Sequence, residues 1–365
     1  MTASNHEEIP AMTPAPTPGD VLTTAAPAIS AEEAGAILQR WFGVTGTVRE
    51  LSSERDRNFH ISAPNERGGN GQGYVLKFTN PAEPQLVTGF QTGAMQHVAA
   101  RDPALPVPRV VPTLDGEAQA IVQIDGIAMV LRLLTYLEGT PLHAAPPSPG
   151  LMRALGTTLA QLDRALADYE HPGSERDLLW DITRTASVAD RLHYVADDRR
   201  RRMVERFVAR FADQVAPRLP ALRHQVIHND LNPHNAVVDP VGHETVTGII
   251  DFGDALRAPL ANDLATALAY HVTSGETPFG SVVEMTRAYN AVLPLTAEEV
   301  ELLPDLVAGR LALTIGITSW RAAEYPANAA YILRNAERAF AGLDRLTGDE
   351  AVTARRLLHL ACQKV

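Results

Sequence analysis

The feature that most constrains this chain is a polar segment, residues 226–235, with the sequence Val-Ile-His-Asn-Asp-Leu-Asn-Pro-His-Asn. Pro233 prevents a regular helix here, so we expect the segment to be a loop. It contains Asp230 and, five positions later, Asn235. A short apolar run then ends at Asp251, in the triplet Asp-Phe-Gly. Any fold of this chain has to hold these three oxygen-bearing side chains at the ends of β elements.

Residues of these types in this order are those that phosphoryl transfer requires. The reaction needs in-line positioning and neutralisation of phosphate charge, usually through magnesium, and little covalent help. Asp230 is placed to accept or orient the proton of an acceptor hydroxyl, whereas Asn235 and Asp251 offer the oxygen ligands that Mg²⁺ prefers. Lys77 alternates with apolar residues in the run 74–78, from which it can reach nucleotide phosphates. The sequence therefore predicts a Mg²⁺-dependent kinase.

Length, charge and cysteine content narrow the class of protein. The chain has 365 residues, enough for about two domains. Its net charge of -11 argues against nonspecific nucleic-acid binding, and no apolar run approaches the roughly 18 residues of a membrane span. No secretory signal is visible, and the single cysteine fits a reducing compartment. We expect a cytoplasmic protein without nucleic-acid or membrane partners, while its oligomeric state stays open.

The order of the elements predicts an α+β fold. Residues 1–28 are rich in Pro, Ala and Thr and are expected to be a disordered tail. Residues 29–136 should form a small lobe, which begins with a helix at the capping box of Ser30 and Glu33. The rest of this lobe is expected to be a five-stranded antiparallel sheet, with strands at 47–51, 58–61, 74–79, 118–124 and 127–134 and a helix inserted from Pro84 to about residue 100.

Residues 137–365 are expected to form a large, mostly helical lobe. Its first helix is capped by Ser148, opens with Pro149 and has a stripe of leucines on one face. Further helices are expected at 203–215, 263–272, 281–290, 296–319 (with a break considered at Pro304), 327–346 and 350–362, interrupted by the polar segment and by strands at 236–239 and 245–250. A β-rich small lobe followed by a helical large lobe is the bilobal layout of protein kinases.

Several blocks of the chain resemble the aminoglycoside phosphotransferase and choline kinase superfamily and, within it, hydroxylysine kinase and its bacterial relatives. The blocks are residues 51–59, 73–77, 132–139 and 226–235, with the Asp-Phe-Gly triplet at 251–253. The resemblance spans about residues 30–345. It implies transfer of a nucleotide γ-phosphate to the hydroxyl of a small amino-alcohol or amino acid, with a hydroxylysine-type acceptor favoured. It also raises GTP beside ATP as the donor.

The resemblance further implies roles for individual residues. Asp230 resembles the catalytic base of the family, Asn235 and Asp251 resemble its metal ligands, and Lys77 resembles its phosphate-binding lysine. The other implied nucleotide-binding residues are Ser53 and Arg55 in a loop over the phosphates, and Leu133, Thr135 and Leu137 at the hinge that binds the base.

Supporting and acceptor-binding residues are expected around this set. We expect His228 to brace the catalytic loop, and Asp263 to cap the next helix and brace the magnesium loop. The small-lobe helix lacks the glutamate that would pair with Lys77, and Gln91 is the expected substitute, since Glu83 lies early. The candidates for acceptor binding are Trp180, Asp181, Arg257, Trp320 and Arg321.

Other interpretations of these patterns stay open at this point. Homoserine, choline or ethanolamine, methylthioribose and aminoglycosides are alternative acceptors, because the superfamily builds its acceptor pockets from the variable helical lobe. A nucleotide-binding pseudokinase scaffold would fit the missing helix glutamate. A zinc site at His228, Asp230 and His234 is disfavoured, since no short-spaced helical histidine pair is present. The glycine cluster at 68–73 precedes a strand, which favours a hairpin tip over a phosphate loop.

Overall fold

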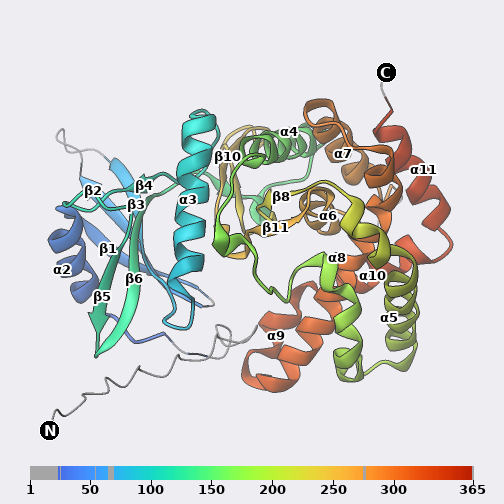
Figure 1. The fold of residues 1–365 in the computed structure, drawn as a ribbon, viewed down its shortest axis with the longest axis horizontal. Helices are drawn as coiled ribbons and strands as arrows, with labels where there is room; N and C mark the ends of the chain where they lie inside the picture. The colour runs from blue at the N-terminus through green and yellow to red at the C-terminus, as the bar shows by residue number, and fades with distance from the viewer. Residues whose placement is uncertain (1–23, 25, 54, 65–69, 274–276, 364–365) are drawn as a thin grey trace, which may run out of the picture.

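The computed structural model of the chain describes residues 24, 26–53, 55–64, 70–273 and 277–363. Its N-terminal part is a β-sheet with helices on both faces, and its C-terminal part is mostly helical (Figure 1). This is the mixed α+β, kinase-like architecture that the sequence predicts. The expected tail, residues 1–28, lies for the most part outside the described residues, as does part of the glycine-rich turn at 68–73.

The small lobe is built on a six-stranded antiparallel sheet with the order β1-β2-β3-β6-β4, in which β5 also pairs with β6. The strands are β1 (Thr47–Leu51), β2 (Arg57–Pro64), β3 (Asn70–Phe78), β4 (Val110–Val111), β5 (Ala120–Ile124) and β6 (Ile127–Thr135). The prediction of five strands therefore omitted β4. Two residues are too few for an alternating pattern to be visible in the sequence.

Strand alternation gives β3 two different faces. Leu76 and Phe78 are fully buried in a core that includes Leu38 of helix α2 (Ala31–Phe42). Lys77 lies between them and so belongs to the opposite face. Figure 1 shows α2 on the outer side of the sheet and α3 (Gln85–Arg101) between the sheet and the helical part. The helix α2 begins at the expected capping box, in which Ser30 and Glu33 exchange hydrogen bonds.

Helix α3 joins the small lobe to the large one. Its buried residues Phe90, Met95 and Val98 belong to the same hydrophobic core as the helices of the large lobe. The hydroxyl of Tyr169 donates to the carbonyl oxygen of Phe90 at 2.9 Å. Because α3 is packed on both lobes, the position of the sheet relative to the catalytic segment is set by buried contacts.

The large lobe packs its helices around three short β ladders. Strand β7 (Thr140–Pro141) and strand β10 (Val246–Ile249) both pair with β9 (Ala236–Val238), and β8 (His224–Ile227) pairs with β11 (Leu256–Pro259). The helices are α4 (Pro149–Leu166), α5 (Asp198–Arg210), α6 (Ala261–Ala269), α7 (Gly280–Val292), α8 (Ala297–Glu324), α9 (Ala329–Ile332), α10 (Ala336–Thr347) and α11 (Ala351–Ala361). Across the described chain, no helix has the length and apolar character needed to cross a membrane.

Three expectations for the helices are corrected. Helix α8 continues unbroken through Pro304, because burial of the helix outweighs the roughly 3 kcal/mol cost of an internal proline. The single helix expected at 327–346 is instead divided into α9 and α10 by a 3₁₀ turn, Leu333–Asn335. A 3₁₀ segment that the sequence pattern did not indicate, Ile182–Tyr194, packs against α8.

The close approach of α4 and α7 gives the first testable prediction. A Cβ at Gly156 of α4 would lie 2.2 Å from the backbone oxygen of Met285 in α7. Gly156→Ala should therefore lower the free energy of unfolding by about 1–3 kcal/mol, because the two helices must separate. Gly35→Ala in α2 is the matched control, since its Cβ would meet only Val48 at 3.5 Å, and it should raise stability by up to about 1 kcal/mol. Urea unfolding of both variants measures this, and equal effects would contradict it.

Candidate active site

The candidate catalytic loop, residues 228–235, connects β8 to β9 and is held through its backbone. Asn229 has a left-handed conformation with a φ of 64°. As a result two successive amides reach one carboxylate: His228 N and Asn229 N donate to Asp263 Oδ2 and Oδ1 at 2.9 and 2.7 Å. Asp263 comes from α6 and is fully buried. The loop conformation therefore depends on a carboxylate from a later helix.

His228 ties the same loop to the end of β10. Its Nδ1 accepts from Asp230 N at 3.3 Å, so Nε2 carries the proton and donates to Ile250 O at 3.1 Å. The expectation for Asp263 is corrected in two respects. Helix α6 begins at Ala261 with no side-chain cap, and the hydrogen bonds of Asp263 go to the catalytic loop and not to the magnesium loop.

Asp230 has hydrogen-bond donors on both carboxylate oxygens. Arg310 Nη2 donates to Oδ1 at 2.9 Å, while the side-chain amides of Asn232 and Asn235 donate to Oδ2 at 2.9 and 2.7 Å. Burial raises the pKa of Asp230 to about 7, although the charge of Arg310 acts in the opposite direction. The carboxyl group is therefore oriented by its neighbours and is more basic than an ordinary aspartate.

Arg310 was not among the residues expected from the sequence. It lies in α8 with 2% of its surface exposed, and it also donates to Trp180 O at 2.9 Å and to the hydroxyl of Tyr270 at 3.3 Å. Its guanidinium lies 5.2 Å from the centre of the Trp180 ring. The available signal was a lone arginine in the apolar run 306–317, because a charge inside a buried helix needs a partner.

The candidate metal loop, residues 251–254, follows β10. Asp251 has a φ of 65°, accepts from Gly253 N at 3.0 Å through Oδ1, and has about half of its side chain exposed (51%). Desolvation acts to raise the pKa of Asp251, but the charges of Lys77 and Arg55 outweigh it and hold this pKa below its usual value. Arg55 Nη2 also donates to Asp254 at 2.6 Å. This contact joins the loop between β1 and β2 to the metal loop.

Lys77 forms its short ion pair with a residue that the sequence analysis did not single out. Its Nζ lies 2.7 Å from Asp56 Oδ2 and 4.0 Å from Asp251 Oδ1. Asp56 is in turn fixed by two amide hydrogen bonds: its Oδ1 accepts from Asn80 N at 2.8 Å, and its own N donates to Ser53 Oγ at 3.2 Å. The signal for Asp56 was its place beside Arg55 in the block 51–59.

The small-lobe helix region supplies other contacts than those expected. The hydrogen bonds of Gln91 go to Arg132, whose Nη1 donates at 3.1 Å, and to Gly253 O at 3.4 Å, instead of to Lys77. Glu83 pairs with Arg176 at 3.4 Å. Asp56 therefore takes the part of the missing glutamate, from a loop and not from the helix.

The hinge residues lie where β6 leaves the sheet. Leu133 pairs with Leu76 of β3, and Thr135 N donates to Arg109 O at 2.9 Å. Leu137 follows the end of β6 and is half-buried. Among the described residues no backbone–backbone hydrogen bond of Leu137 is formed.

The acceptor candidates are spread over more than one place. Trp180 stacks with Arg310 beside Asp230, as described above. Asp181 is buried and caps the following 3₁₀ segment by accepting from Thr183 N at 2.9 Å. Burial raises the pKa of Asp181. Trp320, near the end of α8, is stacked at 5.0 Å by Arg191, and Arg321 follows it in the last turn of that helix. Among these candidates, Trp180 is in direct contact with Arg310, a partner of Asp230.

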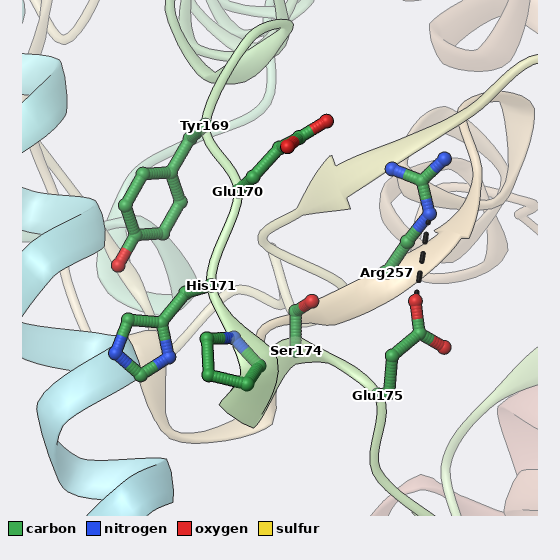
Figure 2. Close-up of a pocket in the computed structure, with 7 residues that line it drawn as sticks. Tyr169, Glu170, His171, Ser174, Glu175 and Arg257 are labelled. Atoms are coloured by element: carbon green, nitrogen blue, oxygen red, sulfur yellow. Dashed lines mark ion pairs between the residues drawn. The ribbon is translucent and has the colours of Figure 1, made fainter.

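Arg257 belongs to a separate cavity. This cavity has a volume of about 380 Å³ and is lined by Tyr169, Glu170, His171, Pro172, Ser174, Glu175 and Arg257 (Figure 2). The Nε of Arg257 lies 3.5 Å from Glu175. None of the proposed catalytic, metal or nucleotide residues is in the lining, so Arg257 is not grouped with them.

The residues present fit a Mg²⁺ ion bound together with nucleotide phosphates. Within the described parts of the chain, no group of three or more His, Cys, Asp or Glu side chains could hold a metal alone. Mg²⁺ normally takes only one or two protein carboxylates beside phosphates and water. The half-exposed carboxylate of Asp251 and the amide oxygen of Asn235, whose nitrogen is turned to Asp230, meet that requirement.

The chain is similar in sequence to characterised kinases. The model of the "Phosphotransferase enzyme family" (APH) matches residues 47–295. A hydroxylysine kinase from Danio rerio is 29% identical, with 88% of this chain and 92% of that protein covered. A homoserine kinase from Methylobacillus glycogenes is 31% identical, with 68% of this chain and 71% of that protein covered.

Among solved structures, the fold is similar to that of the amicoumacin kinase hAmiN in complex with AMP-PNP, Ca²⁺ and Ami. The TM-score is 0.63 at 15% identity, over 85% of this chain and 93% of that one. This likeness concerns the fold. Together with the sequence match over residues 47–295, it establishes that the chain belongs to the APH phosphotransferase family and is a small-molecule kinase.

Proposed function

We propose that this kinase transfers the γ-phosphate of ATP or GTP to the hydroxyl of a small amine-bearing metabolite, with hydroxylysine as the favoured acceptor. The observation that carries the proposal is the cluster of Asp230, Asn235, Asp251 and Lys77. Asn235 donates to Asp230 at 2.7 Å, and Lys77 lies 4.0 Å from Asp251. Ile250 N, next to Asp251, donates to Asn235 O at 2.9 Å and links the two pairs. These contacts support a site in which an acceptor base, metal ligands and a phosphate-binding cation act together, as phosphoryl transfer requires.

Each side chain has a distinct part in the proposed reaction. Asp230 accepts the proton of the acceptor hydroxyl. The oxygen of that hydroxyl attacks the γ-phosphorus, and the bond from the γ-phosphorus to the nucleoside diphosphate breaks. Lys77 and Arg55 neutralise charge on the phosphates. Asn235 and Asp251 would hold Mg²⁺, which supplies further charge neutralisation when bound. The backbone of Leu137 would bind the nucleotide base.

Arg310 is proposed to position the base. Its bond to Oδ1, with those of Asn232 and Asn235 to Oδ2, fixes the plane of the Asp230 carboxylate. The ion pair with Arg310 also favours the charged form of the Asp230 carboxylate, which burial alone would disfavour. Trp180 extends this arrangement, because its carbonyl oxygen accepts from Arg310 Nη1 and its ring lies against the same guanidinium.

Two observations support the proposed class of acceptor: the similarity to the curated kinases and the net charge of the chain. The similarity to hydroxylysine kinase covers 92% of that protein, against 71% for the homoserine kinase, so hydroxylysine is favoured and homoserine is the second candidate. A net charge of -11 would also attract a substrate with two ammonium groups. The scaffold alternative loses its support, since Asp56 provides the carboxylate that the small-lobe helix lacks.

Removal of the base is the first prediction from this mechanism. Asp230→Asn should lower kcat by about 10²–10⁴-fold, because the amide cannot take the hydroxyl proton. The affinity for nucleotide should stay close to that of wild type, since the side chain of residue 230 would face the acceptor and not the nucleotide. Asp190→Asn, at an exposed position, is the matched control and should retain full activity. Turnover and nucleotide titration measure this, and an active Asp230→Asn enzyme would remove the mechanism.

The ion pair with Arg310 gives a second prediction. Arg310→Met should lower the free energy of unfolding by about 3–5 kcal/mol, because it leaves the Asp230 carboxylate largely buried without its counter-charge. In the Asp230→Asn background the same change should cost about 1–3 kcal/mol less. A double-mutant cycle by urea unfolding measures the coupling. An identical cost in both backgrounds would show that the pair contributes no net interaction.

A panel of acceptors tests the proposed substrate. Hydroxylysine should be phosphorylated with a kcat/KM at least about tenfold above homoserine, choline, ethanolamine, methylthioribose and an aminoglycoside, each assayed with ATP and with GTP. Nucleoside diphosphate release is the readout, and the phosphorylated product is identified by mass. A higher value for homoserine would favour the second candidate, and transfer to none of these acceptors would overturn the proposal.

A further inference from the structure

A group of buried polar side chains lies beneath the catalytic loop, outside the set used above. It consists of Asp163 from α4, Asp263 from α6 and Tyr289 from α7, all fully buried. The hydroxyl of Tyr289 donates to Asp163 Oδ2 at 2.5 Å. After burial, the charge of Asp263 and a hydrogen bond between the two side chains raise the pKa of Asp163. Two carboxyl groups therefore meet in the interior of the large lobe.

Asp263 is the member of this pair with hydrogen-bond donors on both carboxyl oxygens. Both of its oxygens accept backbone amides, from His228 at 2.9 Å and from Asn229 at 2.7 Å. Hydrogen bonds of this kind favour the ionised form of a carboxyl group. They also keep Asn229 in its left-handed conformation. The negative charge of Asp263 is thus used to hold the loop that carries Asp230.

Asp163 lacks what an ionised carboxylate would need. Its Oδ1 is buried and accepts no hydrogen bond among the described residues. The titratable groups that act on it are Asp263 and Tyr289, neither of which is a cation. Arg223, just before β8, pairs with Glu299 of α8 and also donates to Pro294 O at 3.0 Å, and neither Arg223 nor Glu299 is among the groups that act on Asp163. Burial and then Asp263 raise the pKa of Asp163 well above its usual value.

A proton on Asp163 Oδ1 resolves both difficulties at once. The oxygen becomes a donor, its acceptor is Asp263, and the repulsion between two buried carboxylates disappears. We propose that Asp163 is a positioning residue: a neutral carboxylic acid that donates its proton to Asp263 and through it fixes the catalytic loop. The protonation state of Asp163 does not depend on the proposed function, whereas the expected effect on turnover rests on that function.

The pH dependence of stability tests the protonation state without any turnover. If Asp163 is neutral in the fold, folding takes up a proton above the pKa of an unfolded aspartate, about 4. Its contribution is fully present below that pH and is lost as pH rises toward the folded pKa. Relative to Asp163→Asn, the unfolding equilibrium constant of wild type should then rise up to about tenfold per pH unit. Parallel curves for the two proteins would show that Asp163 is ionised and would overturn the proposal.

Turnover tests the positioning role. Asp163→Asn keeps a donor toward Asp263 and an acceptor for Tyr289, so its kcat should stay within about threefold of wild type. Asp163→Leu removes the donor and should lower kcat about tenfold or more, with little change in the KM for nucleotide. Unchanged kcat in Asp163→Leu, or loss of activity in a folded Asp163→Asn, would contradict the role. If wild type transfers no phosphate, the proposed function fails while the stability comparison still decides the protonation state.

A spectroscopic measurement covers the case in which Asp163→Asn does not fold. The infrared carbonyl band of a protonated carboxyl group should persist above neutral pH in a Glu83→Gln/Asp181→Asn/Asp230→Asn triple variant, where the three other carboxyl groups of raised pKa are removed. Absence of that band would overturn the proposal.

Discussion

Charged side chains at the candidate site are partly withdrawn from water, and the rest of this structure depends on how their charges are paired. A buried carboxylate is tolerated only with a close cation or with several hydrogen-bond donors. Three such pairs lie at the candidate site: Asp230 with Arg310, Asp56 with Lys77, and Asp254 with Arg55. The Asp254–Arg55 pair joins the two lobes and the other two pairs each join segments within one lobe, so the contacts that satisfy the charges also hold the candidate site together.

The packing around the cleft serves this arrangement. Helix α3 is buried on both lobes, which sets the sheet with Lys77 opposite the catalytic loop. Helices α4, α6 and α7 bring Asp163, Asp263 and Tyr289 together beneath that loop. Stability and catalysis are thereby linked, because the residues that neutralise one another in the interior also orient the base.

The order of the candidate catalytic residues and most of the helices and strands could be predicted from the sequence. The motif residues are local, and the capping box at Ser30, the β5–β6 hairpin and the fold class follow from short-range patterns. Partners of the motif residues could not be predicted in the same way. Arg310 lies 80 positions from Asp230, and Asp56 replaces an expected helix residue. The two-residue β4, the break between α9 and α10 and the continuity of α8 depend on tertiary packing, which local propensity does not contain.

The position of a bound metal tests directly whether Asn235 and Asp251 form the metal site. A crystal of the protein with Mn²⁺ and a non-hydrolysable nucleotide, measured for anomalous scattering from manganese, locates the ion without reference to activity. If Asn235 and Asp251 bind the metal, a manganese peak should lie within bonding distance of both residues, with Lys77 on the nucleotide phosphates. A nucleotide bound outside the cleft, or a metal coordinated without either residue, would contradict the proposed site.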